Sequence, residues 1–98
     1  MLVDAENVRR SQWPNLSGEE LERLSARWAE ANDVDADVVW EGETSADDAI
    51  ADRALELTAA GRPYWLATSD RELRERAGPN AERLIGGGSF LRELLGVA

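Results

Sequence analysis

The chain has 98 residues, 43% of them hydrophobic and 32% charged, with a formal net charge of −9 at pH 7. This length supports one small core, and the composition is that of a globular rather than a disordered protein. Because cysteine and histidine are both absent, disulfide scaffolds, thiolate zinc sites, cysteine nucleophiles and histidine bases are excluded. Any catalysis must therefore use carboxylates, hydroxyls, amides, cations or a bound ion.

The acidic excess also restricts the choice of partners and location. Proteins that bind nucleic acid usually present a basic patch, and here the arginines group only locally, at Arg9–Arg10 and at Arg71, Arg74 and Arg76. No apolar run approaches the roughly 20 residues that span a bilayer, and the N-terminus lacks a signal-peptide pattern. We therefore expect no membrane contact and a cytoplasmic location.

The first half of the chain predicts two short strands around one helix. A strand begins at Leu2–Val3, and Arg9–Asn15 has no helical or strand period and is predicted as a loop. Ser17–Glu20 matches a capping box at the start of a helix that runs to about Ala31. Val38–Trp40 is the second predicted strand.

The second half continues the alternation of helices and strands. A helix from near Ser45 ends at Gly61, and the apolar segment Tyr64–Thr68 is predicted as a strand covered on both faces. A short helix over Arg71–Arg76, an edge strand at Arg83–Ile85 and a terminal helix over Phe90–Leu95 complete the prediction. This order predicts an α/β fold, a three-layer αβα sandwich around a small, mostly parallel sheet.

Acidic residues recur where the predicted strands end. Asp4, Asp47, Asp48 and Asp70 each lie after an apolar segment and before polar sequence. The carboxyl ends of parallel strands share one edge of a sheet, so these carboxylates are expected to converge. Oxygen ligands of this kind are those that Mg²⁺ prefers. A metal site is therefore one hypothesis for this edge.

The same acids also fit a purely structural role. Ser45–Asp48 and Ser69–Glu72 both match capping boxes, and acids in a first helical turn are favoured by the helix dipole. Asp4 has no such explanation, because no helix is expected to start directly after it, and its alternative role is a charged loop residue. Asp52 is expected on a solvated helix face and is left out of the site.

Aromatic and glycine residues leave further alternatives open. Trp13, beside Arg9 and Arg10, could stack on bases or could cover the sheet edge, whereas the other three tryptophans are expected in the core. The glycines at 86–88 could let backbone amides approach a phosphate at a helix start, or could form a flexible connection.

Three segments carry a family resemblance. Asp4–Val8, Ser45–Ala51 and Thr68–Leu73, in this order, resemble the three acidic motifs of the NYN (YacP-like) domains, relatives of the PIN nucleases. The similarity extends through Gly86–Leu91, so residues 1–98 are interpreted as a single NYN/PIN-like domain in a shortened form. The resemblance implies a PIN-like, Rossmann-like topology with one or two Mg²⁺ or Mn²⁺ ions, and several members of the family cut RNA.

The expected function is that of a metal-dependent endoribonuclease. By the resemblance, the metal ligands and catalytic residues are Asp4, Asp47, Asp48 and Asp70. The expected substrate contacts are Asn7, Arg9, Arg10, Thr68, Ser69 and Arg71. The alternative is a non-catalytic RNA-binding or protein-interaction module of the same fold, favoured by the acidic surface and by Val38–Ser45, where one strand stands in place of two. RNA, with or without a ribosomal context, is the expected partner, and a homodimer could complete one edge of the sheet.

Overall fold

The computed structural model describes residues 1–96 and confirms the α/β class. Its single sheet has four strands, all parallel, in the order β2-β1-β3-β4. The strands are β1 (Leu2–Asp4), β2 (Asp37–Val39), β3 (Trp65–Ala67) and β4 (Arg83–Ile85). Each therefore falls within or beside the segment from which it was predicted.

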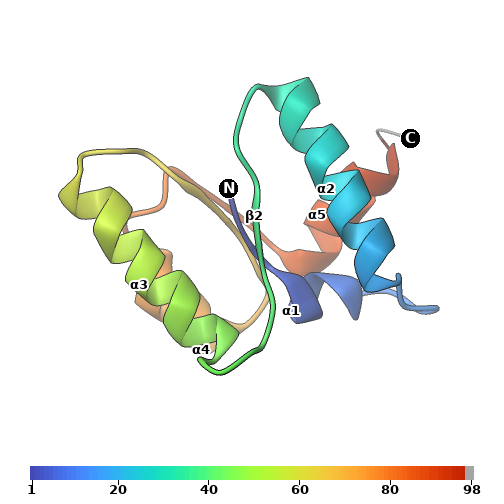
Figure 1. Ribbon diagram of the computed structural model, residues 1–98, viewed down its shortest axis with the longest axis horizontal. Coiled ribbons are helices and arrows are strands. Elements are labelled where there is room, and N and C mark those ends of the chain that lie inside the picture. The colour runs from blue at the N-terminus through green and yellow to red at the C-terminus, as the bar shows by residue number, and fades with distance from the viewer. Residues whose placement is uncertain (97–98) are drawn as a thin grey trace.

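Within residues 1–96, five helices cover the sheet. They are α1 (Ala5–Arg9), α2 (Gly18–Asn32), α3 (Ala46–Ala59), α4 (Arg71–Ala77) and α5 (Gly87–Gly96). Figure 1 shows α3 and α4 on one side of the sheet and α2 and α5 on the other, so the predicted three-layer sandwich is confirmed. Among residues 1–96, no helix combines the length and the apolarity needed to cross a bilayer.

Strand alternation gives each face of the sheet its own core. Val3 and Ala67 belong to the core beneath α1, α2 and α5, whereas Leu2 and Leu66 belong to the core beneath α3 and α4. These four side chains are at most 1% exposed. A strand that is covered on both faces is apolar along its covered length, as Trp65–Ala67 is in β3.

Trp28 of α2 is the centre of the first core. Its ring lies edge-on to Phe90 of α5 at a centroid distance of 5.0 Å and to Trp65 of β3 at 5.9 Å. The indole Nε1–H donates to Glu93 Oε2 at 3.2 Å, so its polar atom is also satisfied. The final helix is thereby joined to the first long one.

Side-chain caps fix the starts of the two longest helices, as predicted. The Ser17 hydroxyl accepts from the Glu20 amide and the Ser45 hydroxyl from the Asp48 amide, each at 3.1 Å. After α3 the chain turns at Gly61, whose φ of 68° is a conformation that glycine adopts without strain.

Two boundaries differ from the prediction. A five-residue helix, α1, starts directly after Asp4, where no helix was expected; it is held by ion pairs from Glu6 to Arg9 and Arg10 and is too short to show a period. The terminal helix starts at Gly87 rather than Phe90, because the Phe90 amide already donates to the Gly86 carbonyl at 2.8 Å.

Candidate active site

The acidic residues gather at the point in the parallel sheet where successive strands are added on opposite sides of β1. The central strand β1 has β2 on one side and β3 on the other, so the crevice outside the carboxyl ends of β1 and β3 is the topological switch point of the sheet. A pocket of about 700 Å³ lies there. It is lined by Asp4, Glu6, Asn7, Arg10, Ser11, Glu41, Asp47, Ser69, Asp70 and Gly88. Three of the four expected acidic ligands are thus brought together.

Asp4 is the most buried of these acids, with 6% of its surface exposed. The hydroxyl of Thr68 donates to its Oδ2 at 2.8 Å and accepts from the Asp70 amide at 3.0 Å, so one hydroxyl links the ends of β1 and β3. Burial raises the pKa of Asp4, the Thr68 hydrogen bond opposes this, and repulsion from Asp47, Asp70 and Glu41 raises the pKa further.

Asp47 experiences the same negative field. Its pKa is raised by burial first, then by repulsion from Asp70 and Glu41, while Arg76 acts in the opposite direction. We call Asp4, Glu41, Asp47 and Asp70 the acidic cluster. Because these carboxylates repel one another across the pocket, the site favours the arrival of positive charge.

The cluster does not enclose an ion tightly. Within residues 1–96, no three acidic side chains are arranged to hold a metal ion. Mg²⁺ nevertheless keeps several waters and is usually bound by only one or two carboxylates. The chemistry of the donor set, hard carboxylate oxygens that carry negative charge, fits a hydrated Mg²⁺ or Mn²⁺ ion held in that way.

Asp48 is directed away from the pocket. Its Oδ1 accepts from Arg76 Nη2 at 2.9 Å, and this hydrogen bond is the main reason that the pKa of Asp48 is lowered. Neighbouring residues on an α-helix are separated by about 100° around its axis, so Asp47 and Asp48 do not face the same space. Of the acidic pair at the start of α3, only Asp47 lines the pocket.

Glu41 is a member of the cluster that was not predicted from the sequence. Glu41 lies just after the end of β2, and Asp4 is the last residue of β1. The Oε1 atom of Glu41 accepts a hydrogen bond of 3.1 Å from the Ala46 amide at the start of α3. The signal was present, because an acid ends β1 and another acid lies within three residues after the end of β2 and of β3. Glu41 was passed over because it lies outside the second acidic motif.

Asn7 and Ser69 hold the rim of the pocket. Asn7 Oδ1 accepts from the Ser69 amide at 2.8 Å, and the Ser69 hydroxyl accepts from the Gly87 amide at 2.7 Å. A Cβ atom at Gly87 would collide with Asn7 Oδ1, so glycine is needed for this approach. The prediction that Ser69 caps α4 is wrong: Asp70 is the cap, and its Oδ1 accepts from the Leu73 amide at 3.0 Å.

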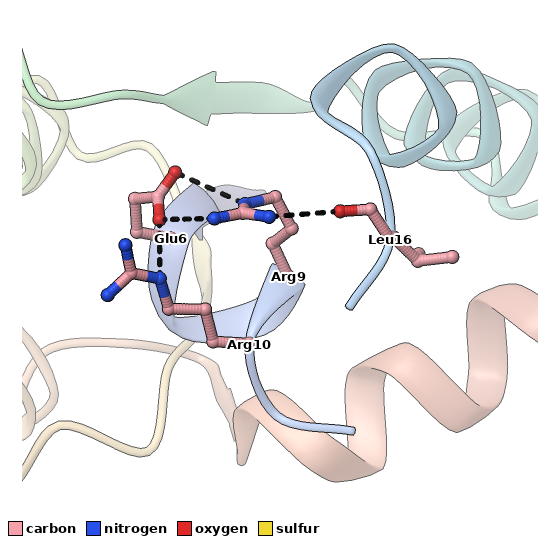
Figure 2. Close-up of polar contacts among 4 residues, drawn as sticks. All are labelled: Glu6, Arg9, Arg10 and Leu16. Atoms are coloured by element: carbon pink, nitrogen blue, oxygen red, sulfur yellow. Dashed lines mark hydrogen bonds and ion pairs between the residues drawn. The ribbon is translucent and has the colours of Figure 1, made fainter. Parts of the chain in front are cut away.

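The two neighbouring arginines differ in their freedom to meet a substrate. Figure 2 shows Arg9 clamped: its Nε and Nη2 donate to Glu6 at 3.2 and 3.0 Å, and its Nη1 donates to the Leu16 carbonyl at 3.2 Å. Arg10 shares Glu6 at 2.9 Å, but its side chain is 68% exposed and lines the pocket. Arg9 therefore supports the loop, and Arg10 remains the substrate candidate.

The other expected substrate contacts do not line the acidic pocket. Thr68 is fully buried and supports Asp4 rather than facing the pocket. The Arg71 side chain is 93% exposed and lies beyond Ser69, outside the acidic pocket. Trp13 is 87% exposed, so it does not cover the sheet edge.

Comparison of the chain with protein-family models, curated proteins and solved structures finds no match. The resemblance to NYN domains therefore rests on the sequence motifs.

Proposed function

We propose that the chain is a Mg²⁺- or Mn²⁺-dependent endoribonuclease of the NYN/PIN-like type, acting in the cytoplasm. The observation that supports this is the gathering of Asp4, Glu41, Asp47 and Asp70 around one pocket at the switch point of a parallel sheet. Repulsion within the cluster raises the pKa of Asp4 and of Asp47. Such a site gains from a cation and has no histidine or cysteine that could act in its place.

The position of each residue in the pocket indicates its role in binding the ion or the substrate. Asp4 and Asp70, at the ends of adjacent central strands, would hold the ion, with Asp47 and Glu41 across the pocket. A bound divalent cation supplies a water of lowered pKa and offsets charge on the phosphodiester transition state. Thr68 fixes the Asp4 carboxylate by its 2.8 Å hydrogen bond, and exposed Arg10 offers a guanidinium to a substrate phosphate.

A second function is favoured by a specific observation. Within the described residues, one short strand, β2 (Asp37–Val39), lies between α2 and α3, and this shortened sheet supports a non-catalytic RNA-binding or protein-interaction module that keeps the fold. The two proposals differ in whether the acidic cluster binds divalent cations and whether RNA is cut.

Calorimetric titration with Mn²⁺ is the first test, because it requires no substrate. We expect binding by the wild type and loss of binding in Asp70→Asn, whereas Asp52→Asn should behave as the wild type. Asp52 is the matched control because it is an exposed acid of α3 that does not line the pocket. Cleavage of single-stranded RNA with Mn²⁺ should then fall by about 100-fold or more in Asp4→Asn. Cleavage that persists in both site variants would refute the assigned site, and absence of both metal binding and cleavage would favour the module.

A further inference from the structure

A second pocket adjoins the acidic one. It has a volume of about 640 Å³, within the size range of small-molecule sites. It lies between α4 and β4 and is lined by Ser69, Arg71, Arg74, Glu75, Gly78, Pro79 and Leu84. Ser69 lines both pockets. Ser69 forms hydrogen bonds with Asn7 and with Gly87. Its position between the two pockets is therefore fixed.

An apolar surface remains open in this pocket. Leu84 pairs with Leu66 in the sheet and so lies on the face covered by α3 and α4, but it belongs to the outer strand β4. Leu66 is fully buried, whereas 36% of Leu84 is exposed. The seven-residue helix α4 therefore leaves Leu84 partly uncovered, beside exposed Pro79.

Positive charge borders this apolar surface. Arg71 and Arg74 lie about one turn apart on α4, and both side chains are exposed. Arg71 Nε is 3.6 Å from Glu75 Oε1, an exposed pair of the kind that contributes little and leaves the guanidinium open to competition. In a chain with a net charge of −9, two arginines beside an apolar surface complement a ligand that has both a phosphate and a flat apolar part.

We infer that this second pocket binds the nucleotide next to the scissile phosphate of a single-stranded RNA. The base lies on Leu84 and Pro79, its phosphate meets Arg71 and Arg74, and the chain crosses Ser69 into the acidic pocket. The inference deepens the proposed function and rests on it. It requires an unpaired base, because the bases of a duplex are stacked on their neighbours and cannot be laid on a protein surface.

The test is fluorescence anisotropy of a fluorescein-labelled oligouridylate with Mg²⁺ present, in an Asp4→Asn background that prevents cleavage of the probe. Arg74→Ala should weaken binding about five- to tenfold, since a charged hydrogen bond is lost, and should reduce the salt slope by about 0.7. Leu84→Ser should weaken binding about threefold without changing the slope. The matched controls are Arg27→Ala and Leu55→Ser, exposed residues of α2 and α3, which should not change it.

The outcomes separate the pocket from the nuclease. RNA cleavage by the wild type, with Arg74→Ala and Leu84→Ser binding as the controls do, would overturn the pocket and leave the nuclease standing. Equal affinity for the same oligonucleotide annealed to its complement, or no binding at all, would also overturn the pocket. Binding that depends on Arg74 and Leu84 without any cleavage would support the pocket and refute the nuclease.

Discussion

Replacing Thr68 by valine tests how the site is built into the fold. Valine keeps the shape of threonine but replaces its hydroxyl with a methyl group. The hydroxyl is fully buried and makes two hydrogen bonds, to Asp4 Oδ2 at 2.8 Å and from the Asp70 amide at 3.0 Å. Both partners lose this contact in the Thr68→Val variant.

The expected loss of stability is large for a domain of this size. A hydrogen bond to a charged acceptor contributes about 1.5–3 kcal/mol, and the partly buried Asp70 amide, left without its partner, costs about 1 kcal/mol, the low end of the range for buried groups. These terms overlap because one hydroxyl serves both groups, so we expect a loss of about 3 kcal/mol near neutral pH. The total free energy of unfolding of a small domain is only about 5–15 kcal/mol.

The loss should depend on pH. Burial raises the folded-state pKa of Asp4 and the Thr68 hydrogen bond lowers it, so removing that bond raises this pKa further. A carboxyl whose pKa is raised by folding contributes stability that is complete below its unfolded pKa and is lost as the pH rises through its folded pKa. The Asp4 part of the Thr68→Val loss should therefore be small in acid and full near neutrality, while the part from the Asp70 amide remains throughout.

Urea unfolding, followed by tryptophan fluorescence at a series of pH values from acid to neutral, provides the measurement. With a slope of about 1–3 kcal/mol per molar urea, a loss of about 3 kcal/mol should lower the midpoint near neutrality by about 1–3 M. Thr68→Ser keeps the hydroxyl and is the control. In the Asp4→Asn background the pH dependence of the loss should disappear. A Thr68→Val variant as stable as Thr68→Ser, or a loss that does not vary with pH, would refute the reasoning.

Three further predictions concern the rim and the surface. Gly87→Ala should destabilise the fold by about 1–3 kcal/mol in thermal unfolding, because the new Cβ meets Asn7 Oδ1, and Asn7→Ala should restore part of this; no rescue would mean that the collision is not the cause. Arg76 lowers the pKa of Asp48, so in Arg76→Ala this pKa should rise toward its ordinary value in an NMR titration. The wild type loses the stability of this ion pair as the pH falls through the folded-state pKa of Asp48, and the variant should lack that stability at every pH. An unchanged pKa would contradict the ion pair. Trp13→Ala should leave the unfolding midpoint unchanged, since the side chain is 87% exposed, but should weaken RNA binding at least about fivefold if the indole stacks on a base; equal RNA affinity would remove Trp13 from the substrate path.

The fold was largely predictable because its signals are local. Capping serines and apolar periods located α2 and α3, and the continuous apolar run of β3 indicated a strand covered on both faces. The start of α5 was not predictable in this way, because glycine has a low helix propensity. It is set by a tertiary contact, the Gly87 amide donating to Ser69, which is 18 residues earlier.

The acidic site was predictable in outline and not in detail. Position after a strand located Asp4 and Asp70 correctly at one edge. The direction of a side chain depends on its partners: Asp48 is drawn to Arg76, which is 28 residues away, and no local pattern encodes that pairing. Helical geometry could have shown that Asp47 and Asp48 point in different directions, and the acid after β2 could have added Glu41.

The contact between Trp28 of α2 and Phe90 of α5 joins two distant parts of the chain, so it has a consequence for folding during synthesis. Phe90, Leu91 and Leu94 of the last helix are at most 1% exposed and complete the core on which α1 and α2 pack. Strand β1, at the centre of the sheet, likewise has no second neighbour until β3 has been made. The N-terminal half therefore cannot reach its native packing while it emerges from the ribosome. Native packing must await the emergence of α5 from the ribosome, and a chain that stops before Phe90 should be lost to proteolysis rather than accumulate as a stable fragment.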